Sequence, residues 1–257
     1  MELRPLGSTG IHVSPLGLGT VKIGRNEQVK YPQGFEIPDD QTVSNLFALA
    51  SELGINFIDT APAYGTSEDR LGQLLPNRED WVIMTKVGEI FENGQSRFDF
   101  SASYTRQSIE SSLSKLKRDR VDIVLVHSDG NDMDIINNQG ALEELEKLKH
   151  QGLVGAYGMS TKTVEGGTWI VEHTDVVMAT YNLETSDELP IIQRAHELNK
   201  GVVVKKGLQS GHAVNVEDAF RHVLTQPGVS SMIVGTINPD HLRSNVEMCN
   251  RVIAEMG

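Results

Sequence analysis

The chain has 257 residues, a formal net charge of −12 at pH 7 and a composition that is ordinary for a globular protein. This acidic balance, without any Lys/Arg run, argues against a nucleic-acid partner. No apolar run approaches the roughly 20 residues that cross a membrane, no signal peptide is evident, and the single cysteine, Cys249, excludes an internal disulfide. We therefore expect a cytoplasmic protein without a membrane partner, either a monomer or a weak homo-oligomer.

Strand and helix patterns alternate along the chain after an initial hairpin. The hairpin joins residues 3–6 to residues 11–13 through a turn at 8–10. A polar stretch at 21–38 predicts a loop, and Asp39 or Asp40 then caps a helix that ends at Gly54. The predicted strands are 16–20, 57–58, 81–84, 121–126, 153–157, 176–179, 201–204 and 231–234. Further helices are predicted at 104–116, 140–149, 163–172, 188–198, 216–224 and 239–255.

Eight strand–helix units in about 250 residues predict an α/β fold of the (β/α)8 TIM barrel type, with the N-terminal hairpin closing the bottom of the barrel. The same alternation also fits a doubly wound open sheet. Against that alternative, no G-x-G-x-x-G fingerprint follows the first strand. No linker or composition shift divides the chain, so residues 1–257 are predicted to form one domain.

Polar side chains follow three consecutive predicted strands. Asp59 ends the second strand and Tyr64 comes five positions later, Lys86 ends the third strand, and His127 ends the fourth. Each has an ordinary alternative role: a turn cap, a loop aromatic, a solvated lysine and a buried histidine with satisfied hydrogen bonds. Because strand ends share one mouth in a barrel, the four together indicate a catalytic site.

These four groups suit protonation of a carbonyl oxygen. A phenol has an ordinary pKa of about 10, and an adjacent ammonium lowers that pKa by favouring the phenolate. A carboxylate keeps the ammonium charged, and an imidazole can orient the carbonyl. No side chain supplies hydride, so a reduced nicotinamide must add it to the carbon.

The sequence resembles the aldo-keto reductase family over nearly its whole length. Spaced motifs occur in the family's order, which makes the match specific. They are Gly19-Thr20, the run from Asn56 to Gly65, Thr85-Lys86-Val87-Gly88, the run from Ser108 to Leu116, the run from Val121 to His127, Gly155-x-x-Gly158-x-Ser160 and Tyr181-Asn182-Leu183.

The resemblance implies a barrel that binds NADP(H) extended across its mouth and acts on a small carbonyl or alcohol substrate. It implies Tyr64 as general acid, Lys86 and Asp59 as residues that tune it, His127 as the residue that positions the carbonyl, and Ser160 as a partner of the nicotinamide carboxamide. It implies no metal. The other cofactor residues that it implies are Gly19, Thr20, Val21, Asp59, Thr161, Met178, Tyr181, Lys205, Lys206, Gly207, Leu208, Ser210, Gly235, Thr236, His241 and Asn245.

Several positions depart from the family pattern around the nicotinamide. Thr161 stands where members usually have Asn, and Met178 stands where they have Gln, so we expect a weaker grip on the carboxamide. Lys205 takes the place of an aromatic that stacks on the ring. Our hypothesis is that Lys205 or Lys206 contacts the pyrophosphate or ribose instead, and the alternative is two solvated lysines.

Other departures concern the adenosine 2′-phosphate. Gly235 and His241 stand where NADP-preferring members have Lys and Arg, and each lost charge-assisted contact is worth roughly 1.5–3 kcal/mol. The start of the last helix still favours phosphate, and Arg243 could substitute. NADP(H) is the expected cofactor, with NAD(H) or dual use as the alternative.

The sequence also bears on the substrate pocket. The family often places a long loop after the last helix, but here Met256 and Gly257 follow it directly. We therefore expect an open pocket that discriminates poorly, with Phe91, Phe98 and Phe100 as its main aromatic candidates.

These residues predict a carbonyl reductase or an aldose or alcohol dehydrogenase. One alternative is a cofactor-binding regulatory or redox-sensing subunit with little turnover, which the intact catalytic residues argue against. Another is a Schiff-base enzyme with Lys86 as nucleophile, which the nearby Asp59 argues against because it would keep the amine charged.

Overall fold

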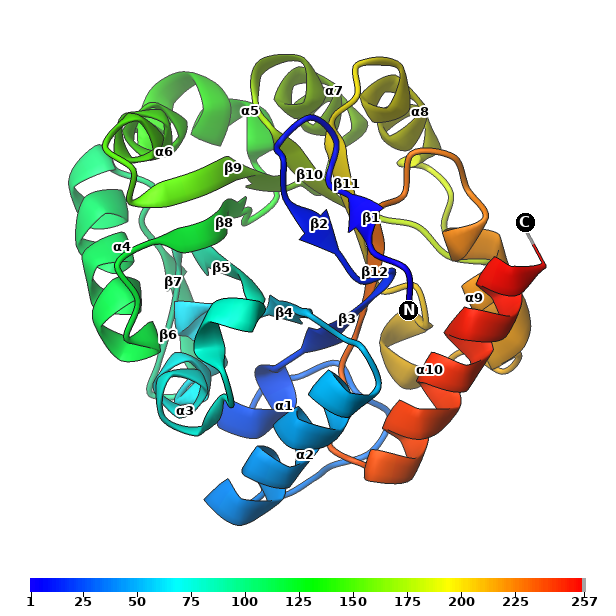
Figure 1. Ribbon diagram of the computed structural model, residues 1–257. Coiled ribbons are helices and arrows are strands. Elements are labelled where there is room, and N and C mark those ends of the chain that lie inside the picture. The colour runs from blue at the N-terminus through cyan, green and yellow to red at the C-terminus, as the bar shows by residue number, and fades with distance from the viewer. Residues whose placement is uncertain (256–257) are drawn as a thin grey trace.

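The computed structural model describes residues 1–255, so Met256 and Gly257 lie outside the described residues. Within residues 1–255, eight parallel strands close into a barrel surrounded by helices, which confirms the predicted (β/α)8 TIM barrel (Figure 1). Each strand pairs with the next along the chain, and β12 pairs with β3 to close the sheet. The strands are β3 (Leu16–Gly19), β4 (Phe57–Asp59), β5 (Val82–Val87), β8 (Val121–His127), β9 (Val154–Ser160), β10 (Val176–Thr180), β11 (Gly201–Lys205) and β12 (Ser231–Val234).

Several helices that surround the barrel begin at polar residues whose side chains cap them. The side chain of Asp39 accepts a hydrogen bond from the Thr42 amide at 2.8 Å, and Ser101 and Thr163 cap two later helices in the same way. The long helices are α2 (Asp40–Glu52), α3 (Ser67–Leu74), α4 (Ala102–Leu116), α6 (Ala141–His150), α7 (Val164–His173), α8 (Leu189–Glu197), α9 (Val216–Leu224) and α10 (Pro239–Ala254). The short ones are α1 (Val21–Gly24), η1 (Pro62–Tyr64), η2 (Arg78–Asp80), α5 (Asp132–Asp134), η3 (Ile135–Gln139) and η4 (Gln209–Gly211).

The N-terminal hairpin closes one end of the barrel, as predicted. Its strands β1 (Arg4–Pro5) and β2 (His12–Val13) lie across the centre of the ring in Figure 1. Leu6 and Val13 are 0% exposed and pack with the residues inside the barrel. Those interior residues are Phe57, Met84, Ile123, Leu125, Ala156, Val176, Met178 and Val203. The interior is therefore a packed core, and ligand access is confined to the opposite end.

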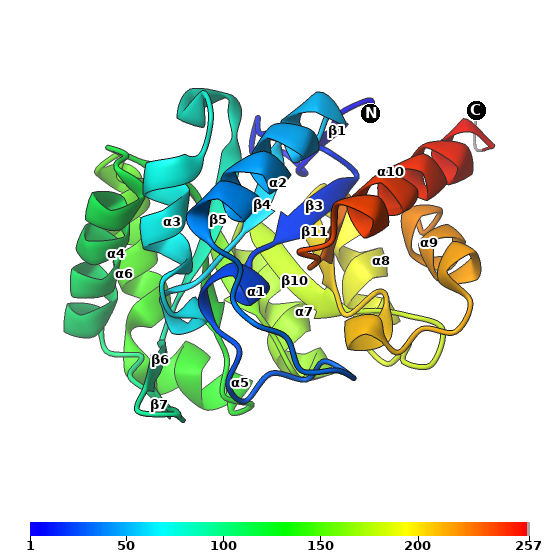
Figure 2. The same cartoon turned by 90° about the horizontal axis from the view of Figure 1, so that it is seen from below.

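Several elements were not predicted from the sequence. The segment 21–38 is not loop throughout, because it begins with α1; α3 was also missed. A second hairpin, β6 (Glu89–Glu92) and β7 (Gln95–Phe98), lies at the end of the barrel opposite β1 (Figure 2). Its turn is Asn93-Gly94, both with positive φ, and this dipeptide is a recognised hairpin signal.

Candidate active site

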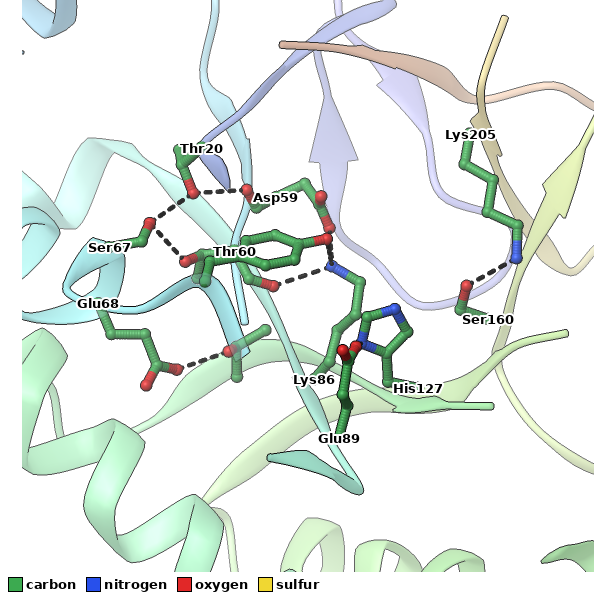
Figure 3. Close-up of polar contacts among 12 residues, drawn as sticks. Thr20, Asp59, Thr60, Ser67, Glu68, Lys86, Glu89, His127, Ser160 and Lys205 are labelled. Carbon is green, nitrogen blue, oxygen red and sulfur yellow. Dashed lines mark hydrogen bonds and ion pairs between the residues drawn. The ribbon is translucent and has the colours of Figure 1, made fainter. Parts of the chain in front are cut away.

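The carboxyl ends of the barrel strands carry the predicted catalytic residues. Asp59, His127, Ser160 and Lys205 are the last residues of β4, β8, β9 and β11, and Lys86 is the penultimate residue of β5. Because the strands are parallel, these side chains surround one cavity of about 810 Å³ at the end away from the N-terminal hairpin. Figure 3 shows Asp59, Lys86 and His127 gathered on one side of this mouth and Ser160 with Lys205 on another.

Lys86 is the centre of the first group. Its side chain is 2% exposed, and Nζ donates to Asp59 Oδ1 at 2.5 Å, to the Thr60 carbonyl at 2.9 Å and to Tyr64 Oη at 3.1 Å. These three bonds use every N–H of the ammonium. Tyr64 reaches the lysine from η1, directly after β4. The amine–phenol contact predicted from the sequence is therefore present.

A hydroxyl network holds the end of β4 in place. Thr20 Oγ1 donates to the Asp59 carbonyl at 2.8 Å, and Ser67 Oγ donates to Thr20 Oγ1 at 2.7 Å (Figure 3). Thr60 Oγ1 lies 2.9 Å from Ser67 Oγ. This network joins β3, β4 and α3, so the backbone that carries Asp59 is fixed from two sides.

The electrostatics of the phenol differ from the expectation. Burial raises the pKa of Tyr64 and Asp59 raises it further; Lys86 lowers it, as predicted, and the resulting pKa is about 12. Burial by itself would lower the pKa of Lys86, but Asp59 and Tyr64 together outweigh burial, so that pKa is raised. The expectation of a phenol more acidic than usual is therefore wrong for the protein without a ligand. At neutral pH the site holds a protonated phenol beside a charged amine.

His127 contacts a carboxylate that the sequence reasoning missed. Its Nδ1 lies 2.8 Å from Glu89 Oε2, and the ring meets Tyr64 edge to face at 6.4 Å between centroids. Glu89 also accepts from Ser96 Oγ at 2.6 Å and lies 3.5 Å from Arg25. The only local signal was its position directly after Gly88 in the lysine motif.

The pKa shifts of this pair set the charge state of the imidazole and of the carboxylate. Burial would raise the pKa of Glu89, but contacts with His127, Ser96 and Arg25 outweigh it and lower the pKa to about 2. Burial, with Lys86 adding to it, lowers the pKa of His127 against the opposing effect of Glu89. The imidazole is thus neutral at pH 7. Since Nδ1 faces a carboxylate, we infer that Nδ1 carries the proton and Nε2 is an acceptor.

Lys205 forms the second group with the end of β9. Its Nζ donates to Ser160 Oγ at 2.8 Å and to the Thr161 carbonyl at 2.6 Å. Burial lowers the pKa of Lys205 to about 8, with Lys206 and Lys162 adding to that effect and Glu188 opposing it. Lys206 is exposed and has a positive φ of 58° in the turn after β11. The two lysines therefore occupy different environments.

Glycines line the cavity at the end of β3 and directly after β12. Gly19 and Gly235 face each other, and a Cβ on Gly19 would come within 3.4 Å of the Gly235 Cα. A Cβ on Gly235 would come within 3.0 Å of Tyr31 Oη. This cradle lies in a cavity within the range of roughly 300–1,000 Å³ that is usual for small-molecule and cofactor sites. The cavity is therefore large enough for a small molecule or a cofactor.

Most predicted cofactor residues line this cavity, as do all four predicted catalytic residues. Three do not. Thr161 is fully buried, Tyr181 stacks on His222 with 4.5 Å between ring centroids, and Gly207 packs so closely that a Cβ would lie 2.3 Å from Met232 Sδ. The predicted cofactor residues in the lining are Gly19, Thr20, Val21, Asp59, Ser160, Met178, Lys205, Lys206, Leu208, Ser210, Gly235, Thr236, His241 and Asn245.

A model of the aldo/keto reductase family matches residues 15–219. The chain belongs to the aldo/keto reductase family. It is 54% identical to an aldo-keto reductase structure from Pseudomonas aeruginosa, PA4992, which covers 98% of this chain and 96% of that one with a TM-score of 0.91. It is 25% identical to the uncharacterized oxidoreductase YqkF of Bacillus subtilis over 97% of this chain and 92% of that protein. It is 32% identical to L-galactose dehydrogenase of Arabidopsis thaliana over 82% of this chain and 66% of that protein.

In this aldo/keto reductase, part of the segment 21–38, which the sequence predicts as a loop, lines the mouth of the barrel. Lys22 and Tyr31 both line the cavity, and Lys22 Nζ lies 3.9 Å from the centre of the Tyr31 ring. Tyr31 in turn meets Phe35 edge to face at 5.8 Å. Figure 2 shows the dark blue chain after α1 running along the end of the barrel away from β1. These residues carry no periodic pattern that could have identified them.

The start of α10 is already capped in this aldo/keto reductase. Asn238 Oδ1 accepts from the Asp240 amide at 2.8 Å and from the His241 amide at 3.3 Å, and Pro239 has no N–H. Asp240 adds a negative charge in the first turn. These two amides therefore already have an acceptor, and phosphate binding at this helix start stays a prediction.

A second cavity of about 270 Å³ adjoins Tyr64 and His127. Its lining combines polar and charged side chains with the aromatic rings of Tyr31, Tyr64 and His127. The three predicted aromatic residues, Phe91, Phe98 and Phe100, do not line either cavity. The guanidinium carbon of Arg25 lies 3.4 Å from the centre of the Phe91 ring, and Phe98 stacks on Phe100. The polar lining residues are Arg25, Gln28, Lys30 and Glu89.

Residues 1–255 contain neither a membrane-spanning helix nor a cluster of metal ligands. No helix there has the length and apolar character to cross a membrane. No three side chains of His, Cys, Asp or Glu in that range converge as metal ligands.

Proposed function

We propose that this aldo/keto reductase transfers hydride between a nicotinamide dinucleotide and the carbonyl carbon of a small, hydroxylated substrate. The observation that carries the proposal is the Asp59–Lys86–Tyr64 group in a cavity of cofactor size. The nicotinamide, when bound, supplies or accepts the hydride. The side chains manage the proton and the charge on the substrate oxygen.

Tyr64 donates the proton to the carbonyl oxygen in the reduction. Its phenol is protonated at neutral pH because its pKa is about 12. As the proton leaves, the Lys86 ammonium stabilises the developing phenolate through the bond at 3.1 Å. Asp59 offsets the charge of Lys86. The raised pKa of Lys86 keeps its amine charged, which argues against Lys86 as a Schiff-base nucleophile.

His127 and the second cavity support a hydroxylated substrate. The neutral imidazole offers Nε2 as an acceptor, so it suits a hydroxyl group next to the reacting carbon. The cavity beside it presents Gln28, Lys30 and Arg25. L-galactose dehydrogenase, one of the relatives above, is named for a sugar substrate. Together these features favour a sugar or a similar hydroxy-carbonyl over an apolar aldehyde.

For the cofactor we propose dual use of NADPH and NADH. Ser160 would hold the carboxamide, Gly19 and Gly235 would let the dinucleotide approach the strand ends, and the exposed Lys206 would face its pyrophosphate. Gly235 and His241 supply no fixed cation for a 2′-phosphate, and Asn238 already caps α10. The absence of a strong 2′-phosphate site supports dual use.

We also propose that the chain acts as a single domain. The closed sheet joins β3, near the N-terminus, to β12, near the C-terminus, so no part of the barrel is complete without the other.

Tyr64→Phe tests the proposed function. Reduction of aldehydes, ketones and sugars would be followed by nicotinamide absorbance with NADPH and with NADH. We expect the variant to lose activity by roughly 10²–10⁴-fold while it still binds both cofactors, measured by fluorescence titration. Full activity in the variant would remove Tyr64 from the mechanism. Lack of binding of either cofactor to the natural protein would refute the proposed function itself.

A further inference from the structure

Lys205 is a partly buried cation on the wall of the main cavity. It comes from the end of β11 and reaches past β10 to the end of β9, where Nζ contacts Ser160 Oγ at 2.8 Å and the Thr161 carbonyl at 2.6 Å. Figure 3 shows it on the side of the mouth opposite Asp59 and Lys86. The proposed mechanism assigns no role to this charge.

Two of the three N–H groups of Lys205 are used by these oxygens. The residue lines the cavity, so the third N–H is available to a ligand there. Acidic groups near it are Glu188, directly before α8, and Asp132 on α5, and cationic neighbours are Lys162 and Lys206. His127 faces it across the mouth and is neutral at pH 7. Of these charged groups, Lys205 and Lys206 line the cavity, and Glu188 accepts a hydrogen bond from the Thr180 amide at 3.0 Å.

We infer that Lys205 is a cofactor-positioning residue that makes the site bind the reduced nicotinamide more tightly than the oxidised one. This inference rests on the proposed function, in which Ser160 holds the carboxamide. The oxidised ring carries a positive charge and the reduced ring carries none. An ammonium bonded to the carboxamide's own partner therefore repels only the oxidised form.

The same residue supplies a donor that the site otherwise lacks. Thr161 and Met178 stand where an amide side chain would grip the carboxamide, and neither lends an amide group to the cavity. The third N–H of Lys205 can donate to the carboxamide oxygen in either redox state. Lys205 thus contributes a hydrogen bond that forms with both redox states of the nicotinamide and an electrostatic repulsion that acts on the oxidised state. Only the charge effect discriminates between the two states.

The test measures binding and not turnover. Dissociation constants for NADPH, NADP⁺, NADH and NAD⁺ would be determined by fluorescence titration and calorimetry at pH 7 for the natural protein, Lys205→Met, Lys205→Arg and Lys206→Met. We define the preference as the dissociation constant of the oxidised form divided by that of the reduced form. We expect this ratio to be roughly tenfold lower in Lys205→Met than in the natural protein. Lys205→Arg should keep the preference. Lys206→Met, the matched control on the adjacent residue, should weaken the binding of both redox forms alike and leave the ratio of their dissociation constants unchanged.

An unchanged ratio in Lys205→Met would overturn the inference. A change of the ratio in Lys206→Met as large as that in Lys205→Met would also overturn it. If Lys205→Met does not fold, a pH series on the natural protein replaces it. The ratio should then fall as pH rises through the titration of Lys205 and should stay constant in Lys205→Arg; a constant ratio in both proteins overturns the inference. Failure of the natural protein to bind any nicotinamide form would instead refute the proposed function, so the two failures are distinguishable.

Discussion

Replacing Lys86 by Met is expected to lower both the stability of the fold and the rate of catalysis. Lys86 is 2% exposed and Asp59 is 7% exposed, and their charges meet at 2.5 Å. The substitution leaves the Asp59 carboxylate buried without its cation. Breaking a buried pair from one side costs about 3–5 kcal/mol of unfolding free energy. We therefore expect a large loss of stability.

The same change removes the donor to Tyr64 Oη. Without Lys86, burial and Asp59 both hold the pKa of the phenol high, so proton donation to the carbonyl becomes harder. We expect kcat to fall by roughly 10²–10⁴-fold, the usual worth of a positioned general acid. Urea unfolding measures the first effect, and steady-state reduction of an aldehyde with saturating cofactor measures the second.

The double variant Asp59→Asn, Lys86→Met separates the two effects. Removing the carboxylate should restore most of the lost stability, because no buried charge is left unpaired. It should not restore kcat, because the phenolate still lacks its cation. A double variant as unstable as Lys86→Met alone would refute the argument from the unpaired charge. A single variant with unimpaired kcat would refute the role of Lys86 in proton donation.

Three further changes test other parts of the site and core. Glu89→Gln removes the carboxylate that raises the pKa of His127, so NMR titration should show that pKa lowered further. His241→Arg supplies a cation for the 2′-phosphate, so the dissociation constant for NADPH should fall by roughly tenfold or more, with a much smaller change for NADH. Burial raises the pKa of Glu68, so the stability it contributes is present below the unfolded pKa of about 4.3 and is lost as pH rises through the folded pKa. Glu68→Gln, neutral at every pH, should therefore gain stability relative to the natural protein in urea unfolding between pH 5 and pH 8.

Each of these has an outcome that contradicts it. An unaltered His127 titration in Glu89→Gln would mean that the contact at 2.8 Å carries no electrostatic weight. An equal fall in the dissociation constants of NADPH and NADH in His241→Arg would mean that this residue does not contact the 2′-phosphate. A stability difference for Glu68→Gln that is constant with pH would show that Glu68 titrates alike in the folded and unfolded protein.

The sequence by itself determined the barrel and the residues at its mouth. Hydrophobic runs and helix caps are local features, so each of the eight strands was found near its true position. Asp59, Lys86 and His127 were recognisable because they follow apolar runs, and parallel strands bring their ends to one mouth whatever the details of packing.

Only the tertiary structure decided which groups those residues meet. Lys205 and Ser160 are 45 positions apart, and their contact depends on the register across β9, β10 and β11. Glu89 reaches His127 because the β6–β7 hairpin folds over the mouth. The direction of the pKa shift of Tyr64 also depends on burial, which no local pattern reports. Local preferences place elements along the chain, whereas contacts and desolvation exist only after the barrel closes.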